Sequence, residues 1–116
     1  MALCEVFFQN IDPLFKILHR PSVQGFIQDQ KQYLDYEPHH QAPATLAGAI
    51  YLTAACGIPE SQCRLLLGTD KRTSVLHLKD QVETDLTKAK LFISEDITVL
   101  QAYVLFLVGS EIIIRR

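Results

Sequence analysis

The chain has 116 residues, of which 48% are hydrophobic and 21% are charged, and its formal net charge is −2. A folded domain typically has roughly 100 to 150 residues, so we expect a single domain over 1–116 rather than two. Eleven Lys and Arg against thirteen Asp and Glu leave no excess positive charge to neutralise phosphates, which argues against direct binding of nucleic acid.

The three cysteines, Cys4, Cys56 and Cys63, are an odd number and form no CxxC pair. They fit neither a disulfide scaffold nor a four-ligand zinc site, so we expect reduced thiols in an intracellular protein. The longest nearly uninterrupted apolar stretch, 102–108, is far shorter than the roughly 20 residues that cross a bilayer. The sequence therefore predicts no membrane segment, no metal site and no cofactor.

Local patterns in the first third of the chain are helical. Apolar residues recur every three or four positions over 6–18, with an interruption where Asp12 can cap, and Pro13 can open, a second short helix. Pro21 repeats this arrangement at the start of the next helix. The pattern predicts one cluster of three aromatic side chains, Phe7, Phe15 and Phe26.

The middle of the chain contains a predicted loop followed by two helices. Residues 35–42, DYEPHHQA, lack periodicity, so we expect a loop there. Pro43 then begins a helix rich in small residues that Gly57 ends. A short helix over 59–67 follows, and Gly68 occupies the position that favours a left-handed residue.

The next predicted helix is long and amphipathic, and either Thr69 or Asp70 caps it. Its apolar residues recur every three or four positions and are expected to face the core: Val75, Leu78, Val82, Leu86 and Ala89. Its charged residues are expected to face solvent: Lys71, Lys79, Asp80, Glu83, Asp85 and Lys88.

Ser94 or Asp96 caps the last predicted helix, 97–108, which is apolar on nearly all sides and is therefore expected at the centre of the fold. The tail IIIRR, 112–116, has the composition of a strand, but no earlier segment alternates as a partner strand would. The whole pattern predicts the all-α class, with about six to seven short helices in a single compact bundle.

Three stretches of the sequence resemble the regulatory domain, or middle homology region, of fungal zinc-cluster transcription factors. The run 7–21, FFQNIDPLFKILHRP, resembles the opening of that domain, and Ala49-Ile50-Tyr51 and 96–106, DITVLQAYVLF, resemble later helices. The similarity covers about residues 5–108 in the same order. It implies the helical fold of the first half of that domain, a nuclear location and a role in transcriptional control.

Two departures from this family limit what the resemblance implies. Its DNA-reading module holds two zinc ions with six cysteines, whereas this chain has three scattered cysteines. Because the six-cysteine module is not present in these residues, we expect no DNA binding by this domain itself. Residues 109–116 diverge from the family pattern, so we also expect the domain to be truncated. Half a bundle is expected to leave apolar surface exposed, which a homodimer, another protein partner or a hydrophobic small molecule would cover.

Four polar residues are candidates for a site. Tyr51 and Tyr103 lie on the two most apolar predicted helices, where each hydroxyl needs a partner or a cavity, so they are the ligand-binding candidates. Packing in the core is nevertheless the favoured interpretation of both. Asp12 and His19 could meet across the short Pro13 helix, although capping of helix ends explains both residues without chemistry.

Two further groups have a structural and a chemical interpretation. His39 and His40 are adjacent and could ligate a metal or exchange protons, but no third ligand lies at helical spacing, which favours a solvated loop. Cys56 and Cys63 flank a turn and could form a redox pair, but burial as small side chains is favoured.

The sequence contains no nucleophile elbow, phosphate loop or HExxH motif, so it does not decide whether the protein is an enzyme. The first hypothesis is a stand-alone regulatory domain that binds a partner or a small molecule, located in the nucleus. The alternative is a small cytoplasmic enzyme of fungal secondary metabolism, of the cyclase, isomerase or lyase type. Its candidate catalytic residues would be Tyr51, Tyr103, His19 and Asp12.

Overall fold

A computed structural model of the chain describes residues 2–11, 18–34, 36, 40–88 and 96–115. These residues form no strand, and the prediction of an all-α bundle is confirmed. The described helices are α1 (Ala2–Asn10), α2 (Arg20–Asp29), α3 (Gln41–Cys56), α4 (Glu60–Leu67), α5 (Lys71–Lys88) and α6 (Ile97–Arg115). The predicted Pro13 helix lies outside the described residues. None of the described helices is long and apolar enough to cross a membrane.

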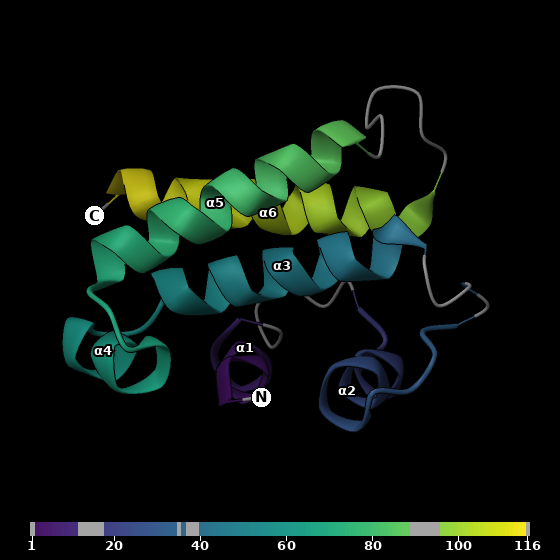
Figure 1. Ribbon diagram of the computed structural model, residues 1–116, viewed down its shortest axis with the longest axis horizontal. Coiled ribbons are helices and arrows are strands. Elements are labelled where there is room, and N and C mark those ends of the chain that lie inside the picture. The colour runs from purple at the N-terminus through teal and green to yellow at the C-terminus, as the bar shows by residue number, and fades with distance from the viewer. Residues whose placement is uncertain (1, 12–17, 35, 37–39, 89–95, 116) are drawn as a thin grey trace.

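The helices form two layers (Figure 1). In one layer α3 and α6 run in the same direction and α5 runs opposite to them, while α1, α2 and α4 lie across the other side of α3. The most extensive contact between two helices is that of α3 with α6, followed by that of α3 with α5. Helix α3 is therefore the centre of the bundle, and 11 of its 16 residues are buried.

Small side chains explain why α3 can occupy this position. A Cβ atom on Gly48 would lie 3.4 Å from Val82 of α5, and one on Gly109 of α6 would lie 3.4 Å from Leu52. Both glycines thus allow a neighbouring helix to approach closely. The hydroxyl of Thr53, which is fully buried, donates to Ala49 O at 2.8 Å and lies 3.2 Å from Leu105 O of α6.

Several helix ends lie where the sequence predicts them. Pro21 stands in the first turn of α2, Gly57 follows α3, and Gly68 follows α4 in the left-handed region with φ of 76°. Of the two alternatives for α5, Asp70 is the cap, since its Oδ2 accepts from Thr73 N at 3.0 Å.

Asp96 caps α6, because its Oδ1 accepts from Thr98 N at 2.8 Å. The alternative cap, Ser94, lies outside the described residues. The expected loop over 35–42 is too long at its C-terminal end, because α3 begins at Gln41 rather than at Pro43. A proline in the first turn of a helix has no internal hydrogen bond to lose, which is why Pro43 is compatible with this earlier start.

The strand-like interpretation of the tail is wrong. Helix α6 continues without a break from Ile97 to Arg115, through Gly109 and Ser110. Gly109 is buried against Leu52, so it serves close helix packing instead of ending the helix. Helix α6 is buried at Ala102 and Leu105, whereas Leu100 is 51% exposed, so one apolar face of the helix is open, in line with the exposed apolar surface that the sequence predicts.

The predicted faces of α5 are correct except at three charged residues: Asp85 is buried, and Lys71 and Lys79 are partly buried. Val75, Val82 and Leu86 are buried, as expected, and Ala89 lies outside the described residues. Asp85 is only 7% exposed, because it stands between Val82 and Leu86 at the edge of the buried face. Lys71 is half-buried because its ammonium turns towards the end of α3.

The predicted cluster of three phenylalanines stays a prediction, and its two described members each pack against another ring. Phe7 is fully buried and meets Phe8 edge-on, with ring centroids 5.4 Å apart. Phe26 packs against Tyr33 with centroids 5.8 Å apart. The third predicted member, Phe15, lies outside the described residues.

Two glycines give opposite predictions for substitution by alanine. A Cβ on Gly68 would meet nothing within 4 Å, so Gly68→Ala is expected to cost about 1 kcal/mol through its left-handed backbone alone. Gly25 lies inside α2, where a Cβ would meet Lys31 Cδ at an ordinary 3.7 Å. Gly25→Ala is therefore expected to stabilise the fold by roughly 0.5–1 kcal/mol. Urea denaturation measures the change in the free energy of unfolding for both variants. Changes of the same sign would contradict a left-handed backbone at Gly68 and a helical one at Gly25.

Candidate functional site

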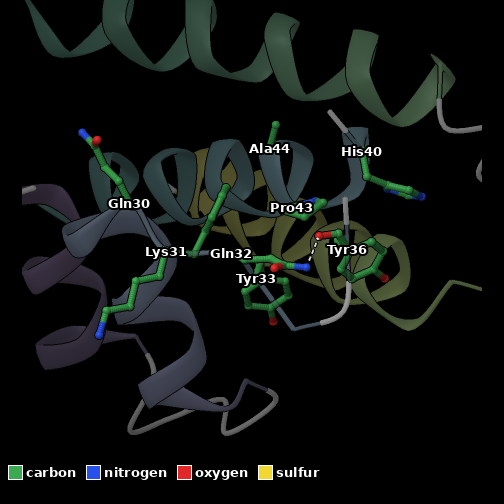
Figure 2. A pocket seen from close by; sticks show the side chains of 9 residues that line it. Gln30, Lys31, Gln32, Tyr33, Tyr36, His40, Pro43 and Ala44 are labelled. Atoms are coloured by element: carbon green, nitrogen blue, oxygen red, sulfur yellow. Dashed lines mark hydrogen bonds between the residues drawn. The ribbon is translucent and has the colours of Figure 1, made fainter. Parts of the chain in front are cut away.

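An aromatic pocket lies between the end of α2, the segment that follows it and the start of α3 (Figure 2). Its volume is about 260 Å³. Four rings, two small apolar residues and three longer polar side chains line it: Phe26, Tyr33, Tyr36, His40, Pro43, Ala44, Gln30, Lys31 and Gln32. We call this site the aromatic pocket.

The rings of the aromatic pocket form a continuous series of contacts. Tyr33 packs against Phe26, and it stacks on Tyr36 with centroids 6.1 Å apart and planes inclined by 16°. Tyr36 in turn contacts the imidazole of His40, with centroids 4.7 Å apart. These separations are those of favourable pairs of rings, so the wall of the pocket is an ordered aromatic surface.

The backbone between α2 and Tyr36 has an unusual conformation. Gln30 and Leu34 both have positive φ values, 56° and 49°, and Leu34 is also 52% exposed. A branched apolar residue in this region is uncommon and costs free energy. A hydrogen bond from Tyr36 N to Tyr33 O at 3.1 Å closes this turn. Leu34, with its unfavourable backbone conformation, lies inside the turn, between the two stacked tyrosines.

Tyr36 also connects the aromatic pocket to α6. Its hydroxyl donates a hydrogen bond to Asp96 Oδ1, the atom that caps the first turn of α6. Burial, and then this bond, raise the pKa of Tyr36 above its usual value. The pocket wall and the N-terminus of α6 therefore share one polar contact.

A second feature is an exposed apolar row along α6. Ile97, Leu100 and Leu107 are 58%, 51% and 48% exposed, and Val104 between them is partly exposed. The spacings of three, four and three residues place all four side chains on one face of the helix. We call these four residues the α6 row.

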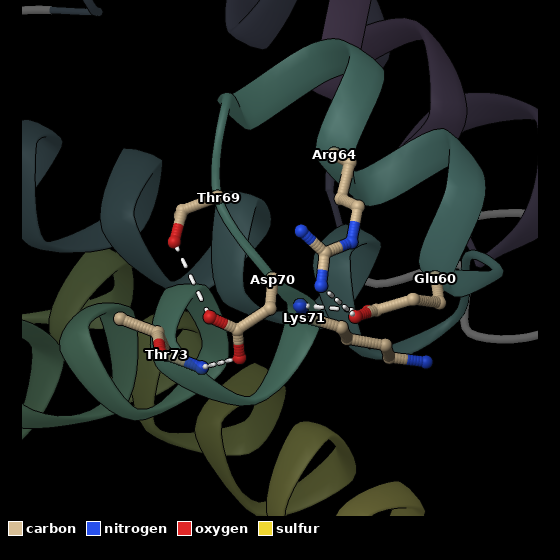
Figure 3. A network of polar contacts seen from close by, with 6 residues as sticks. All are labelled: Glu60, Arg64, Thr69, Asp70, Lys71 and Thr73. Atoms are coloured by element: carbon tan, nitrogen blue, oxygen red, sulfur yellow. Dashed lines mark hydrogen bonds and ion pairs between the residues drawn. The ribbon is translucent and has the colours of Figure 1, made fainter.

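Polar contacts fix the junction of α4 and α5 (Figure 3). Glu60 Oε2 accepts from Lys71 N at 2.7 Å, and Glu60 Oε1 lies 3.3 Å from Arg64. Lys71 Nζ donates to Cys56 O at 3.0 Å and to Ile58 O at 2.7 Å. Glu60 and Lys71 also line an open depression of about 580 Å³. We interpret both as structural residues, because their hydrogen bonds hold the junction of α4 and α5.

The four candidate site residues of the sequence do not form one described cluster. Tyr51 on α3 and Tyr103 on α6 are partly buried and pack against the core. His19 is exposed, directly precedes α2, and its Nδ1 lies 2.7 Å from Ser22 Oγ. Asp12 lies outside the described residues. No hydrogen bond among the described residues joins Tyr51, Tyr103 and His19, and none of the three lines the aromatic pocket.

The histidine and cysteine candidates have structural positions. His40 precedes α3, and its Nδ1 accepts from Ala42 N at 3.1 Å, so it is a helix cap; His39 lies outside the described residues. Cys56 and Cys63 are buried, as expected, and neither takes part in a disulfide within the part of the chain that the structure describes. Among the residues that the structure describes, no three His, Cys, Asp or Glu side chains gather as a metal site.

The sequence patterns do not predict Tyr33 and Tyr36 as site residues, and they predict Phe26 only as a member of the aromatic core cluster. A signal was present, since three aromatic rings and His40 fall within 15 residues, in a stretch interrupted by a predicted loop. Their convergence depends on the positive φ of Leu34, which periodicity does not reveal.

The tyrosines predict a loss of stability at alkaline pH. Burial raises the pKa of Tyr33, Tyr36 and Tyr51 above 10.0, and it raises the pKa of Cys4 above 9.0. The folded state binds these protons more tightly than the unfolded state does. The stabilisation that this contributes is fully present below about pH 9, and it is lost as the pH rises through the raised pKa values. Urea denaturation between pH 7 and 11 should show this decline, whereas constant stability up to pH 11 would contradict it.

Comparison with known proteins assigns the chain to a family. Residues 4–111 match the fungal specific transcription factor domain, and the chain belongs to that family. It is 38% identical over 109 residues to the C6 finger domain transcription factor adaR of Aspergillus niger. It is 39% identical over 111 residues to the C6 finger domain transcription factor nscR of Trichophyton verrucosum.

These alignments cover most of this chain but a small part of each relative. They span 94% of the chain and 14% of adaR, and 96% of the chain and 17% of nscR. No solved structure matches the chain significantly. The resemblance to the regulatory domain of fungal zinc-cluster transcription factors is thereby confirmed.

Proposed function

We propose that this chain is a nuclear regulatory module of the fungal transcription factor family that acts by protein association and does not itself bind DNA. The single observation that carries the proposal is the α6 row. Three large apolar side chains about half exposed on one helix face are a typical feature of a protein-interaction surface.

The spacing of the α6 row supports a helix as its partner. Steps of three and four residues form the apolar seam along which two helices pack with interlocking side chains. The opposite side of α6 is already occupied, since Ala102 and Leu105 are fully buried. The row is therefore a second packing face of the same helix.

The charge pattern supports a second copy of this chain as the partner. From Ile97 to Ser110 the sequence contains no Lys, Arg, Asp or Glu. Two such faces can meet around a two-fold axis without bringing like charges together. A charged partner helix would find no complementary charge along these 14 residues.

The composition supports the absence of DNA binding by these 116 residues. They carry a net charge of −2, and their three cysteines are half the six that hold the two zinc ions of the DNA-reading module. All three cysteines are buried, on α1, α3 and α4. Titration of labelled duplex DNA at low salt should give no saturable change in fluorescence anisotropy.

Sedimentation velocity over a concentration series tests the association. The wild-type chain should show a weight-average sedimentation coefficient that rises towards that of a dimer. Leu100→Lys places a charge in the α6 row and should remain monomeric at every concentration. The matched control is Leu65→Lys on α4, where the leucine is 83% exposed, and it should dimerise as the wild type does.

Two outcomes would overturn the proposal. One is a wild-type chain that stays monomeric over the whole series. The other is equal dimerisation by Leu100→Lys and wild type. Circular dichroism of each variant shows whether the monomer is folded, and the half-exposed position of Leu100 predicts that it is.

A further inference from the structure

We infer that the aromatic pocket binds a small planar aromatic carboxylate of one or two rings. The inference rests on the pocket between α2 and α3, and it does not depend on the α6 row.

The rings of the pocket favour a planar aromatic ligand. Phe26, Tyr33, Tyr36 and His40 all line the pocket. Figure 2 labels the last three of these rings. Ring pairs contribute about 0.5–1.5 kcal/mol each beyond the apolar area that they bury. A saturated molecule of the same size would gain the burial but would lose this contribution.

The volume of the pocket limits the size of the ligand. Sites for drug-sized molecules have roughly 300–1,000 Å³, and this pocket has about 260 Å³. One ring or two fused rings with a short substituent are therefore the appropriate size. Pro43 and Ala44 supply the apolar surface at the start of α3.

The polar groups of the pocket favour a negatively charged acceptor. Among the nine lining residues that the structure describes, Lys31 is the one Lys or Arg and there is no Asp or Glu. His40 Nδ1 accepts a hydrogen bond from Ala42 N, so in the neutral ring Nε2 carries the hydrogen and can donate. Lys31 and His40 lie towards opposite ends of the site in Figure 2. A carboxylate can accept from either donor.

The local backbone gives independent support for a binding site. Leu34 has φ of 49° in the segment that carries Tyr33 and Tyr36. Unfavourable backbone conformations occur more often at binding sites than elsewhere, since the surrounding structure must hold them in place. Here the held segment is the one that presents the two stacked tyrosines.

Calorimetric titration with 2-naphthoate tests the inference. The wild-type chain should bind one equivalent saturably. Decahydro-2-naphthoate, a saturated acid of similar size, should bind up to about tenfold more weakly because it lacks the ring contribution. The neutral 2-naphthalenemethanol should also bind more weakly because it lacks the charge.

Three variants locate the site. Phe26→Leu should weaken binding of 2-naphthoate by up to about tenfold, and Lys31→Gln by up to about fivefold. Lys88→Gln, at the exposed end of α5, changes the net charge equally and should have no effect. Repeating the titration with Leu100→Lys separates this inference from the proposed association, because that variant should bind 2-naphthoate as the wild type does.

The inference is overturned if 2-naphthoate shows no saturable binding. It is also overturned if the saturated acid binds equally well, or if Lys31→Gln and Lys88→Gln have the same effect. Lys31 is exposed, so its substitution does not threaten folding and leaves each of these outcomes interpretable.

Discussion

Leu105→Ala is expected to lower the free energy of unfolding by about 2–5 kcal/mol, the range for large-to-small substitutions in a packed core. Leu105 is fully buried on the side of α6 that meets α3, and its carbonyl oxygen lies 3.2 Å from Thr53 Oγ1. Because α3 and α6 share the most extensive contact of the bundle, a cavity there cannot be filled by movement of a surface loop.

Urea denaturation at low protein concentration measures the effect of Leu105→Ala. Leu65→Ala is the control, since this leucine is 83% exposed and its loss should change stability by less than about 0.5 kcal/mol. Equal losses in the two variants would contradict the assignment of α3 and α6 as the core of the fold.

Lys71→Met is expected to cost about 2 kcal/mol. The ammonium of Lys71 donates to two backbone carbonyls just beyond or at the end of α3, those of Cys56 and Ile58. Hydrogen bonds from a charged group contribute about 1.5–3 kcal/mol, and partial exposure of Lys71 places the expected loss near the lower part of that range.

The matched control for Lys71→Met is Lys79→Met on the same helix. Lys79 lies 3.8 Å from Glu83 in an exposed pair four residues apart, which contributes at most about 0.5 kcal/mol. Urea denaturation of both variants gives the comparison. A loss for Lys79→Met as large as that for Lys71→Met would show that the bonds to Cys56 O and Ile58 O are unimportant.

The sequence predicts the helical class and several helix ends because those features depend on local chemistry. Pro21, Gly68 and Asp70 act within one turn of their own position, so their residue types are informative. The helical class and these helix ends agree with the structure. The family resemblance agrees with the match over residues 4–111.

The errors concern features that depend on distant residues. The local sequence predicts that the helix ends before Gly109. Gly109 nevertheless lies inside α6, where Leu52 packs against it. The helical pattern predicts that Lys71 faces solvent. Its ammonium instead donates to Ile58 O and Cys56 O, which lie 13 and 15 residues away in the sequence. The segment that carries Tyr33 and Tyr36 includes Leu34 with a positive φ, which local patterns do not predict. The apolar helices pointed to Tyr51 and Tyr103 instead.

A nitroxide attached at Leu100→Cys reports whether the α6 row joins two copies of this chain. The three native cysteines are buried, so the introduced thiol is the accessible one among the described cysteines. Position 100 lies two residues from the middle of the row, about 3 Å along the helix. Antiparallel packing would therefore place the two labels about 6 Å apart along the axis, and parallel packing would place them side by side.

A dimer joined at the α6 row should give a dipolar-broadened electron paramagnetic resonance spectrum at concentrations where the wild-type chain dimerises. Dilution of the labelled chain with excess unlabelled wild type should remove the broadening, because mixed dimers carry one label. A spectrum that is narrow at those concentrations and unchanged by unlabelled protein would contradict the claim that the α6 row is the interface.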